Sequence, residues 1–180
     1  NYDFNATEND GSCYYTLEVD ISLHEGSNLV SFYALPDDLE IESFTTPLLG
    51  LLDGVITESS ASYIYANQWI GSLQNFYPDN GYWLIMNNEG NFSFDGYPIG
   101  EDLEYLIHEG ANLISFPSEG AYPLESVLPD NLDEVVYAII SESVSALYLD
   151  GSWWFIPNHP EENKRLQNNK NPVKIYGVAH

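Results

Sequence analysis

The sequence predicts a β-rich α+β protein made of two tandem, pseudo-twofold related repeats of β-hairpins, with one short helix in each repeat. The main observation is that residues 24–32 (HEGSNLVSF) return 84 residues later as residues 108–116 (HEGANLISF). The same spacing relates residues 56–59 to 140–143, and Trp69 to Trp153. Self-similarity at a long, fixed period indicates a duplicated supersecondary unit. Alternating polar and apolar residues between turn dipeptides favour strands over long helices.

The repeats divide the chain into four segments. Residues 1–15 form a calcium-loop-like entry segment, and residues 16–100 form repeat one. Residues 101–163 form repeat two, which is truncated or diverged, and residues 164–180 form a basic tail.

Repeat one begins with a strand over residues 16–23, where polar and apolar residues alternate, followed by a second strand over residues 28–32. Pro36-Asp37-Asp38 then supplies the start of a short helix within residues 39–52. Pro47 and Gly50 interrupt that stretch, so we expect either about two turns or two irregular pieces. Four further strands are predicted, with turns at Ala66-Asn67 and residues 78–81: residues 55–57, 61–65, 68–73 and 81–86.

Repeat two is predicted to copy this plan, with a short helix near residues 124–128. Asp150-Gly151 is a strong hairpin signal between two apolar runs. The predicted strands are residues 103–107, 113–116, 135–140, 146–149 and 153–156. The pattern departs after Trp153, and residues 174–178 could supply a replacement closing strand. A different module, an artificial junction and a tail of altered reading frame are the alternatives for this region.

Charge is distributed very unevenly. All 28 acidic residues precede residue 164, and all four Lys and Arg residues follow residue 163, which gives a net charge of −24. Carboxylates in the acidic body must therefore be solvated, hydrogen-bonded or neutralised by cations. Adaptation to salty surroundings and specific use of divalent ions both account for this acidity. Nucleic acid is disfavoured as a partner because its binding depends on Lys and Arg.

Membrane insertion is not expected, since no apolar run approaches the roughly 20 residues that a span needs. No signal peptide is recognised, and the start at Asn1 without Met suggests a processed or excised piece. If the basic tail is folded, we expect it to lie across an acidic surface of its own or a neighbouring subunit and to act in assembly.

The entry segment offers oxygen atoms at short intervals. Asp3, Asn5, Thr7 and Asp10 precede Gly11, which is suited to a sharp turn. Hard cations prefer such oxygen ligands, although the full EF-hand pattern is not met. These four residues are the predicted Ca²⁺ ligands.

Residues 1–13 (NYDFNATENDGSC) resemble a short repeat, C-N-Y-(D/N)-x-x-A-T-x-x-D-G-S-C, of large secreted proteins of marine bacteria. This repeat is loosely similar to thrombospondin type 3 calcium repeats. In the family pattern a Cys before Asn-Tyr bonds the Cys after Asp-Gly-Ser. The resemblance therefore implies that Cys13 lost its partner where the chain was cut, and that the parent protein is extracellular. An ordinary acidic linker with a free Cys is the alternative.

A second resemblance spans most of residues 23–154. The elements GSNLVSF (26–32), ITE (56–58), NQWIGSL (67–73) and GYW (81–83) are similar to a repeat domain near the C-termini of secreted marine bacterial proteins. It implies an extracellular accessory module. It assigns no catalytic residues.

Two recurring sets of polar residues are candidate sites. His24-Glu25 and His108-Glu109 could serve a metal, but the Gly that follows each pair favours a turn, and no HExxH or CxxC spacing exists. Glu58 and Glu142 could form a glycosidase carboxylate pair. Acceptance of backbone N–H groups explains their recurrence equally well.

Aromatic residues are the remaining candidates for a ligand or interface face. In the adjacent pairs Tyr82-Trp83 and Trp153-Trp154 one ring should face the core and the other should face outward, because successive strand residues point to opposite sides. An outward Trp beside amides and carboxylates suits sugar stacking, whereas exposed aromatics also suit protein contacts. The candidate residues are Trp69, Tyr82, Trp83, Trp153 and Trp154.

These observations predict a noncatalytic extracellular or cell-surface structural or adhesive module, such as a subunit of a filament or surface layer, with Ca²⁺-binding carboxylates. The expected partners are further copies or neighbouring domains of a larger surface protein. A carbohydrate-binding module that recognises polysaccharide is the first alternative. A glycosidase or protease fragment is the second.

Overall fold

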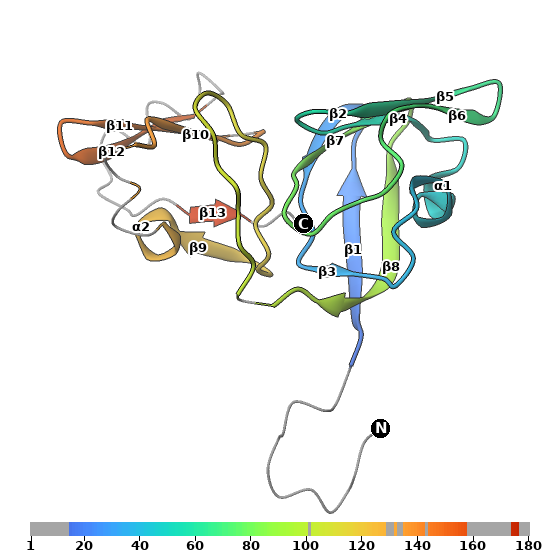
Figure 1. The fold of residues 1–180 in the computed structure, drawn as a ribbon, viewed down its shortest axis with the longest axis horizontal. Coiled ribbons are helices and arrows are strands. Elements are labelled where there is room, and N and C mark those ends of the chain that lie inside the picture. Colours follow the sequence, from blue (N-terminus) through green and yellow to red (C-terminus); the bar gives the residue numbers. More distant parts are fainter. Residues whose placement is uncertain are drawn as a thin grey trace, which may run out of the picture. The chain divides into compact units, whose positions relative to one another are not determined.

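The computed structural model describes residues 15–100, 102–128, 132, 135–142, 144–157 and 174–176. The chain divides into two compact units: unit one contains the described residues up to Glu119, and unit two is Gly120–Tyr176 (Figure 1). Both units are built from antiparallel strands with short helices. The prediction of a β-rich α+β fold is confirmed at this level.

Unit one contains two antiparallel sheets. The five-stranded sheet has the order β2-β7-β4-β5-β6 and the three-stranded sheet has the order β1-β8-β3. The strands of the first are β2 (Gly26–Val30), β4 (Leu52–Ile56), β5 (Ala61–Tyr65), β6 (Gln68–Gly71) and β7 (Tyr82–Met86). Those of the second are β1 (Leu17–Leu23), β3 (Ala34–Leu35) and β8 (Gly90–Pro98).

Strand β1 shows how the sequence pattern produces the fold. Its apolar residues Val19, Ile21 and Leu23 are at most 4% exposed, and the intervening residues face solvent. It pairs along its length with β8, which the sequence analysis did not predict. Gly96 of β8 allows β3 to approach, because a Cβ there would lie 2.7 Å from the backbone nitrogen of Leu35.

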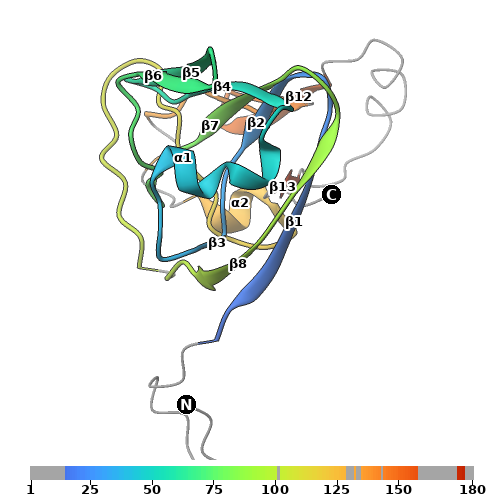
Figure 2. The same cartoon turned by 90° about the vertical axis from the view of Figure 1, so that its right-hand side faces the viewer.

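The predicted helix of repeat one forms as two pieces, α1 (Ile41–Phe44) and the 3₁₀ helix η1 (Thr46–Leu48). Pro47 lies in the first turn of η1, where its missing N–H breaks no hydrogen bond. Helix α1 lies on the core side of the five-stranded sheet (Figure 2). Its two buried residues, Ile41 and Phe44, join the core.

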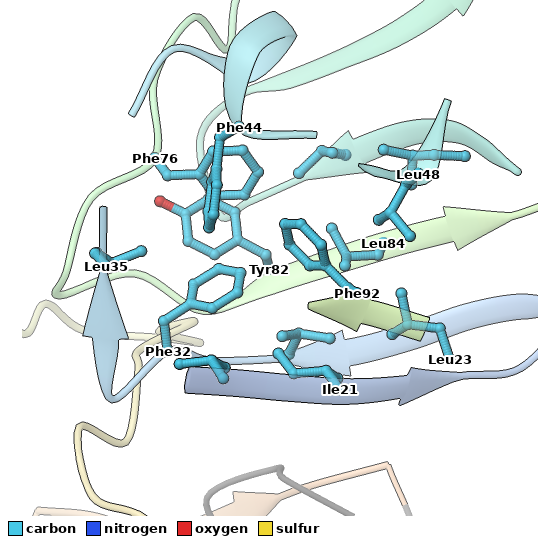
Figure 3. Close-up of a cluster of buried hydrophobic side chains, with 14 of the residues drawn as sticks. Ile21, Leu23, Phe32, Leu35, Phe44, Leu48, Phe76, Tyr82, Leu84 and Phe92 are labelled. Atoms are coloured by element: carbon cyan, nitrogen blue, oxygen red, sulfur yellow. The ribbon is translucent and has the colours of Figure 1, made fainter. Parts of the chain in front are cut away.

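The core of unit one is an aromatic cluster (Figure 3). Phe32 is 1% exposed and lies at its centre. Five other rings have centroids between 5.5 and 6.2 Å from that of Phe32. They belong to Phe44, Phe76, Tyr82, Phe92 and Phe94.

Unit two contains a three-stranded sheet in the order β10-β11-β12 and a separate pair, β9 with β13. The elements are β9 (Ala121–Pro123), α2 (Leu124–Val127), β10 (Ala138–Ile140), β11 (Val144–Leu149), β12 (Ser152–Pro157) and β13 (Lys174–Tyr176). Of the residues 174–178 that could supply a closing strand, Lys174–Tyr176 form β13, which pairs with β9 and does not join the sheet β10-β11-β12.

Strand pairing in unit two repeats that of β4, β5 and β6 with a shift of 84 residues. Gly54↔Tyr63 corresponds to Ala138↔Leu147, and every other pair of β4–β5 and β5–β6 has its counterpart in β10–β11 and β11–β12. The β11–β12 hairpin is longer by two pairs, Val144↔Pro157 and Ser145↔Ile156. The two tight turns also agree: Ala66 and Asn67 have φ of 50° and 60°, and Asp150 and Gly151 have 53° and 79°. Positive φ at both central residues is the type I′ geometry that matches strand twist.

Two predicted strands of repeat two, residues 103–107 and 113–116, are wrong. These residues are irregular apart from one isolated bridge between Asn80 and Ile114. In repeat one the corresponding strand β2 pairs with β7. The residues 84 positions after Tyr82–Met86 read Leu-Gln-Asn-Asn-Lys, which have low strand propensity. The copied strand therefore lacks a copied partner.

Candidate functional site

The two His-Glu-Gly segments form the same turn. In each, the backbone N–H of the His donates to the Asn side-chain oxygen four residues later, at 2.9 Å. The Asn amide donates back to the His carbonyl, at 2.8 Å for Asn28 and 2.9 Å for Asn112. Gly26 and Gly110 have φ of 102° and 107°, which a side chain would strain. The recurring segment is thus an Asn-locked turn.

The residues that follow the second turn dock on the 78–81 loop of the same unit. The backbone N–H of Gly81 donates to the Leu113 carbonyl at 3.0 Å, and that of Ser115 donates to the Asp79 carbonyl at 3.0 Å. The Ser115 hydroxyl, buried at 5% exposure, donates to the Pro78 carbonyl at 2.6 Å. The Leu113 carbonyl and the Ser115 N–H are therefore satisfied by the 78–81 loop.

Glu58 completes this docking and forms what we call the clasp: Glu58, His108 and Leu113. One carboxylate oxygen bonds His108 Nε2, and the other accepts the Leu113 N–H at 2.7 Å. Glu58 follows β4 in the turn to β5, where Thr57 N–H donates to the Ser60 carbonyl at 2.8 Å. Glu58, in a segment that recurs at the 84-residue spacing, thus holds the recurring turn at residues 108–112.

The hydrogen bonds of the clasp require a protonated His108. Its Nδ1 lies 2.8 Å from the Glu109 carbonyl, which can only accept, and its Nε2 faces a carboxylate, which also only accepts when ionised. The Glu109 carbonyl and then Glu58 raise the pKa of His108 above its ordinary value of 6.5. The bonds from His108 and from the Leu113 N–H lower the pKa of Glu58 below 4.5.

The predicted alternation is observed for the pair Tyr82-Trp83. Tyr82 is fully buried, and its hydroxyl donates to the Tyr77 carbonyl at 3.2 Å, while burial raises its pKa to about 12. Trp83 points to the other face of the sheet and is half-buried. The inclusion of Tyr82 among the ligand or interface candidates needs correction, because its ring belongs to the core.

The remaining Trp candidates differ in exposure. Trp153 packs against Tyr148 with ring centroids 5.2 Å apart, whereas Trp154 is 61% exposed. Trp69 is half-buried against the core and lines a hollow of about 150 Å³ between α1 and β5–β6. The hollow is lined by Glu42, Thr45, Thr46, Leu49, Ile64, Asn67 and Trp69. Trp69 and Trp83 lie in unit one, whereas Trp153 and Trp154 lie in unit two. The four Trp residues therefore do not form one site within a single unit.

The predicted calcium ligands Asp3, Asn5, Thr7 and Asp10 lie outside the described residues, as do Cys13 and the tail except for β13. Within the described ranges, no three His, Cys, Asp or Glu side chains converge in a way that could hold a metal ion. None of the helices in the part of the chain that the structure covers is long and apolar enough to cross a membrane.

Sequence reasoning missed the link between Glu58 and His108. Both residues belong to segments that recur at the 84-residue spacing, so each drew attention separately. Their contact arises because residues 108–115 dock on the 78–81 loop and the β4–β5 turn of the same unit instead of pairing in a sheet. Comparisons of the chain with protein-family models, curated proteins and solved structures found no match.

Proposed function

We propose that the chain is a noncatalytic extracellular structural or adhesive module, built from two tandem repeats related by a pseudo-twofold axis. Its carboxylates, with Asp3, Asn5, Thr7 and Asp10 foremost, bind Ca²⁺. Its partners are further copies or neighbouring domains of a surface assembly such as a filament. The resemblance of residues 1–13 and 23–154 to secreted marine bacterial repeats agrees with this setting.

The observation that carries the proposal is the clasp. Both oxygens of Glu58 are engaged by groups of the following repeat, His108 and the Leu113 N–H. A carboxylate with this role positions a neighbouring segment instead of attacking or protonating a substrate. Repeat proteins gain stability from such contacts between successive units. Catalysis by a Glu58 and Glu142 pair is accordingly the least supported alternative.

Exposed apolar side chains support a role in contacts. On the outward face of the five-stranded sheet, Tyr63, Tyr65 and Ile70 are 46%, 74% and 57% exposed. The outward positions of β5 and β6 bear no charge, although the chain carries 28 acidic residues. Charge depletion with aromatic enrichment is characteristic of the centre of a protein interface.

A carbohydrate-binding module is the second candidate. Trp154 offers an exposed ring, and the hollow at Trp69 combines an aromatic wall with Glu42, Thr46 and Asn67. Quenching of Trp fluorescence by polysaccharide, lost on Trp154→Ala or Trp69→Ala, would support this candidate over the assembly module.

Amide hydrogen exchange at Leu113 tests the structural role of Glu58. Glu58→Ala should lower the protection factor of this amide about tenfold or more while the core of unit one stays protected, because the docked segment opens locally. Glu89→Ala, at an exposed carboxylate of the same unit, is the matched control and should change nothing. Unchanged protection in Glu58→Ala would contradict the structural role.

The same amide should report pH. The raised pKa of His108 means that its contribution to docking is complete below pH 6.5 and is lost as pH rises through the folded value. The lowered pKa of Glu58 means that its contribution is complete above pH 4.5 and is lost as pH falls through the folded value. The protection factor of the Leu113 amide, corrected for intrinsic exchange, should therefore be highest at pH values between the folded-state pKa of Glu58 and that of His108.

A further inference from the structure

Strand β10 occupies a different position in its sheet from its counterpart in unit one. The shared register identifies β10 as the counterpart of β4. Strand β4 is paired on both sides, with β5 and with β7, whereas β10 ends the sheet β10-β11-β12 (Figure 1). Among the described residues, β10 pairs only with β11.

The backbone of β10 is oriented to accept another strand. The Tyr148 N–H donates to the Tyr137 carbonyl at 2.9 Å, so these two residues form a hydrogen-bonded pair. Hydrogen-bonded and non-hydrogen-bonded pairs alternate in an antiparallel ladder, which makes Ile139 and Ala146 the next hydrogen-bonded pair. The N–H and C=O groups of Ala138 and Ile140 therefore point away from β11. In unit one the equivalent residues Gly54 and Ile56 pair with β7.

The side chains around this edge are apolar and open to solvent. Residues 135–140 read Val-Val-Tyr-Ala-Ile-Ile, without a charge. Val135, Tyr137 and Ile140 are 62%, 77% and 71% exposed. In unit one, where β7 covers the equivalent edge, Leu51 and Ile56, the counterparts of Val135 and Ile140, are partly buried. Uncharged strands with exposed edges pair readily with other strands, and natural proteins usually block them with charge or proline.

The sequence that follows β12 does not provide a strand that resembles β7, the strand that covers the equivalent edge in unit one. Residues 158–172 contain one aliphatic residue besides proline, Leu166, and so cannot place an apolar side chain at every second position. Strand β7, by contrast, directs Tyr82, Leu84 and Met86 into the core. Strand β7 therefore shows which residue pattern a strand needs in order to pair with the edge of β10: apolar side chains at alternate positions.

We propose that the edge of β10 is a binding site for an extended, antiparallel strand of β7-like chemistry, apolar at alternate positions and supplied by another polypeptide. Transfer of the β4–β7 register predicts that Ile140 faces the residue at the Trp83 position, Ile139 the Leu84 position and Ala138 the Ile85 position. Main-chain bonds would provide affinity and alternate side chains specificity. The proposal rests on the proposed function in one respect: an assembly module meets other chains that could supply the strand.

A synthetic peptide of residues 80–88 (NGYWLIMNN), whose Asn residues aid solubility, tests the site on the full chain. At saturation it should slow amide exchange of Ala138 and Ile140 about tenfold or more and leave Ile139 little changed. The same peptide with Ile85→Pro lacks one N–H that faces the edge and should protect these amides much less. This readout is independent of Ca²⁺, so its failure is separable from failure of the proposed assembly function.

Two variants of the chain sharpen the test. Ala138→Pro removes an edge-facing N–H without removing a bond to β11, and Ile140→Lys places a charge on the edge; each should abolish protection by the peptide. Trp154→Ala, on the opposite edge strand, should leave it intact. Absence of protection by the peptide at saturation would overturn the proposal. Protection of Ala138 and Ile140 that rises with chain concentration without peptide would also overturn it, in favour of pairing between two β10 edges.

Discussion

Phe32→Ala should produce the largest loss of stability of any single truncation in unit one. The ring is 1% exposed and contacts five other aromatic rings, so its removal leaves a cavity that its neighbours cannot fill without losing their own contacts. Burial lost and cavity formed together cost about 3–5 kcal/mol for a Phe of this kind. Native domains have only about 5–15 kcal/mol of unfolding free energy, so unit one would be close to its limit.

Denaturant unfolding, followed by a probe confined to unit one, measures this loss. Tyr65→Ala is the control, because Tyr65 is also aromatic but 74% exposed, and its effect should stay within about 0.5 kcal/mol. A Phe32→Ala variant as stable as Tyr65→Ala would mean that the aromatic cluster is not the core of unit one.

Asn28→Ala should cost more than Asn112→Ala, although both residues lock the same turn. Asn28 is 4% exposed and accepts the His24 N–H while its amide donates to the carbonyls of His24 and Gly26. Its removal takes the Asn28 hydrogen bonds from part-buried backbone groups, at a cost of about 1–3 kcal/mol. Asn112 makes the corresponding bonds but is partly exposed, so water can replace its side chain at a cost of about 1 kcal/mol or less.

Each of the two variants serves as the control for the other, because Asn28 and Asn112 make matching hydrogen bonds but differ in burial. Unfolding free energies of both variants, measured at one pH, are sufficient. Equal losses would show that burial does not decide the strength of the Asn lock, and a greater loss in Asn112→Ala would point to the clasp as the main support of the second turn.

Local signals were sufficient to predict much of the fold. Strand β5 was predicted with its observed ends. The turns at Ala66-Asn67 and Asp150-Gly151 were predicted from Asn67, Asp150 and Gly151, residue types that tolerate positive φ. Pro47 indicated a short, broken helix, which α1 and η1 form. In each case the information lies within a few neighbouring residues.

The missed features depend on distant partners. Strand β8 contains Gly96 and Asp95, which weaken a strand signal, yet Gly96 is needed for the close approach of β3. Residues 113–116 have the same strand pattern as β2 but lie irregularly, because the counterpart of β7 was not copied with them. The clasp follows from that change, and no local pattern around Glu58 could reveal it.

Sedimentation and thermal unfolding of the chain, first with about 5 mM Ca²⁺ and then with excess chelator, test the central claim of a calcium-organised assembly module most directly. Ligand bound only by the folded state at about a hundredfold excess over Kd adds about 2.7 kcal/mol. We expect larger particles and a higher Tm with Ca²⁺, both lost with chelator and in an Asp3→Asn/Asp10→Asn variant. A monomer with the same Tm under both conditions would contradict the claim and leave the acidity as an adaptation to salt.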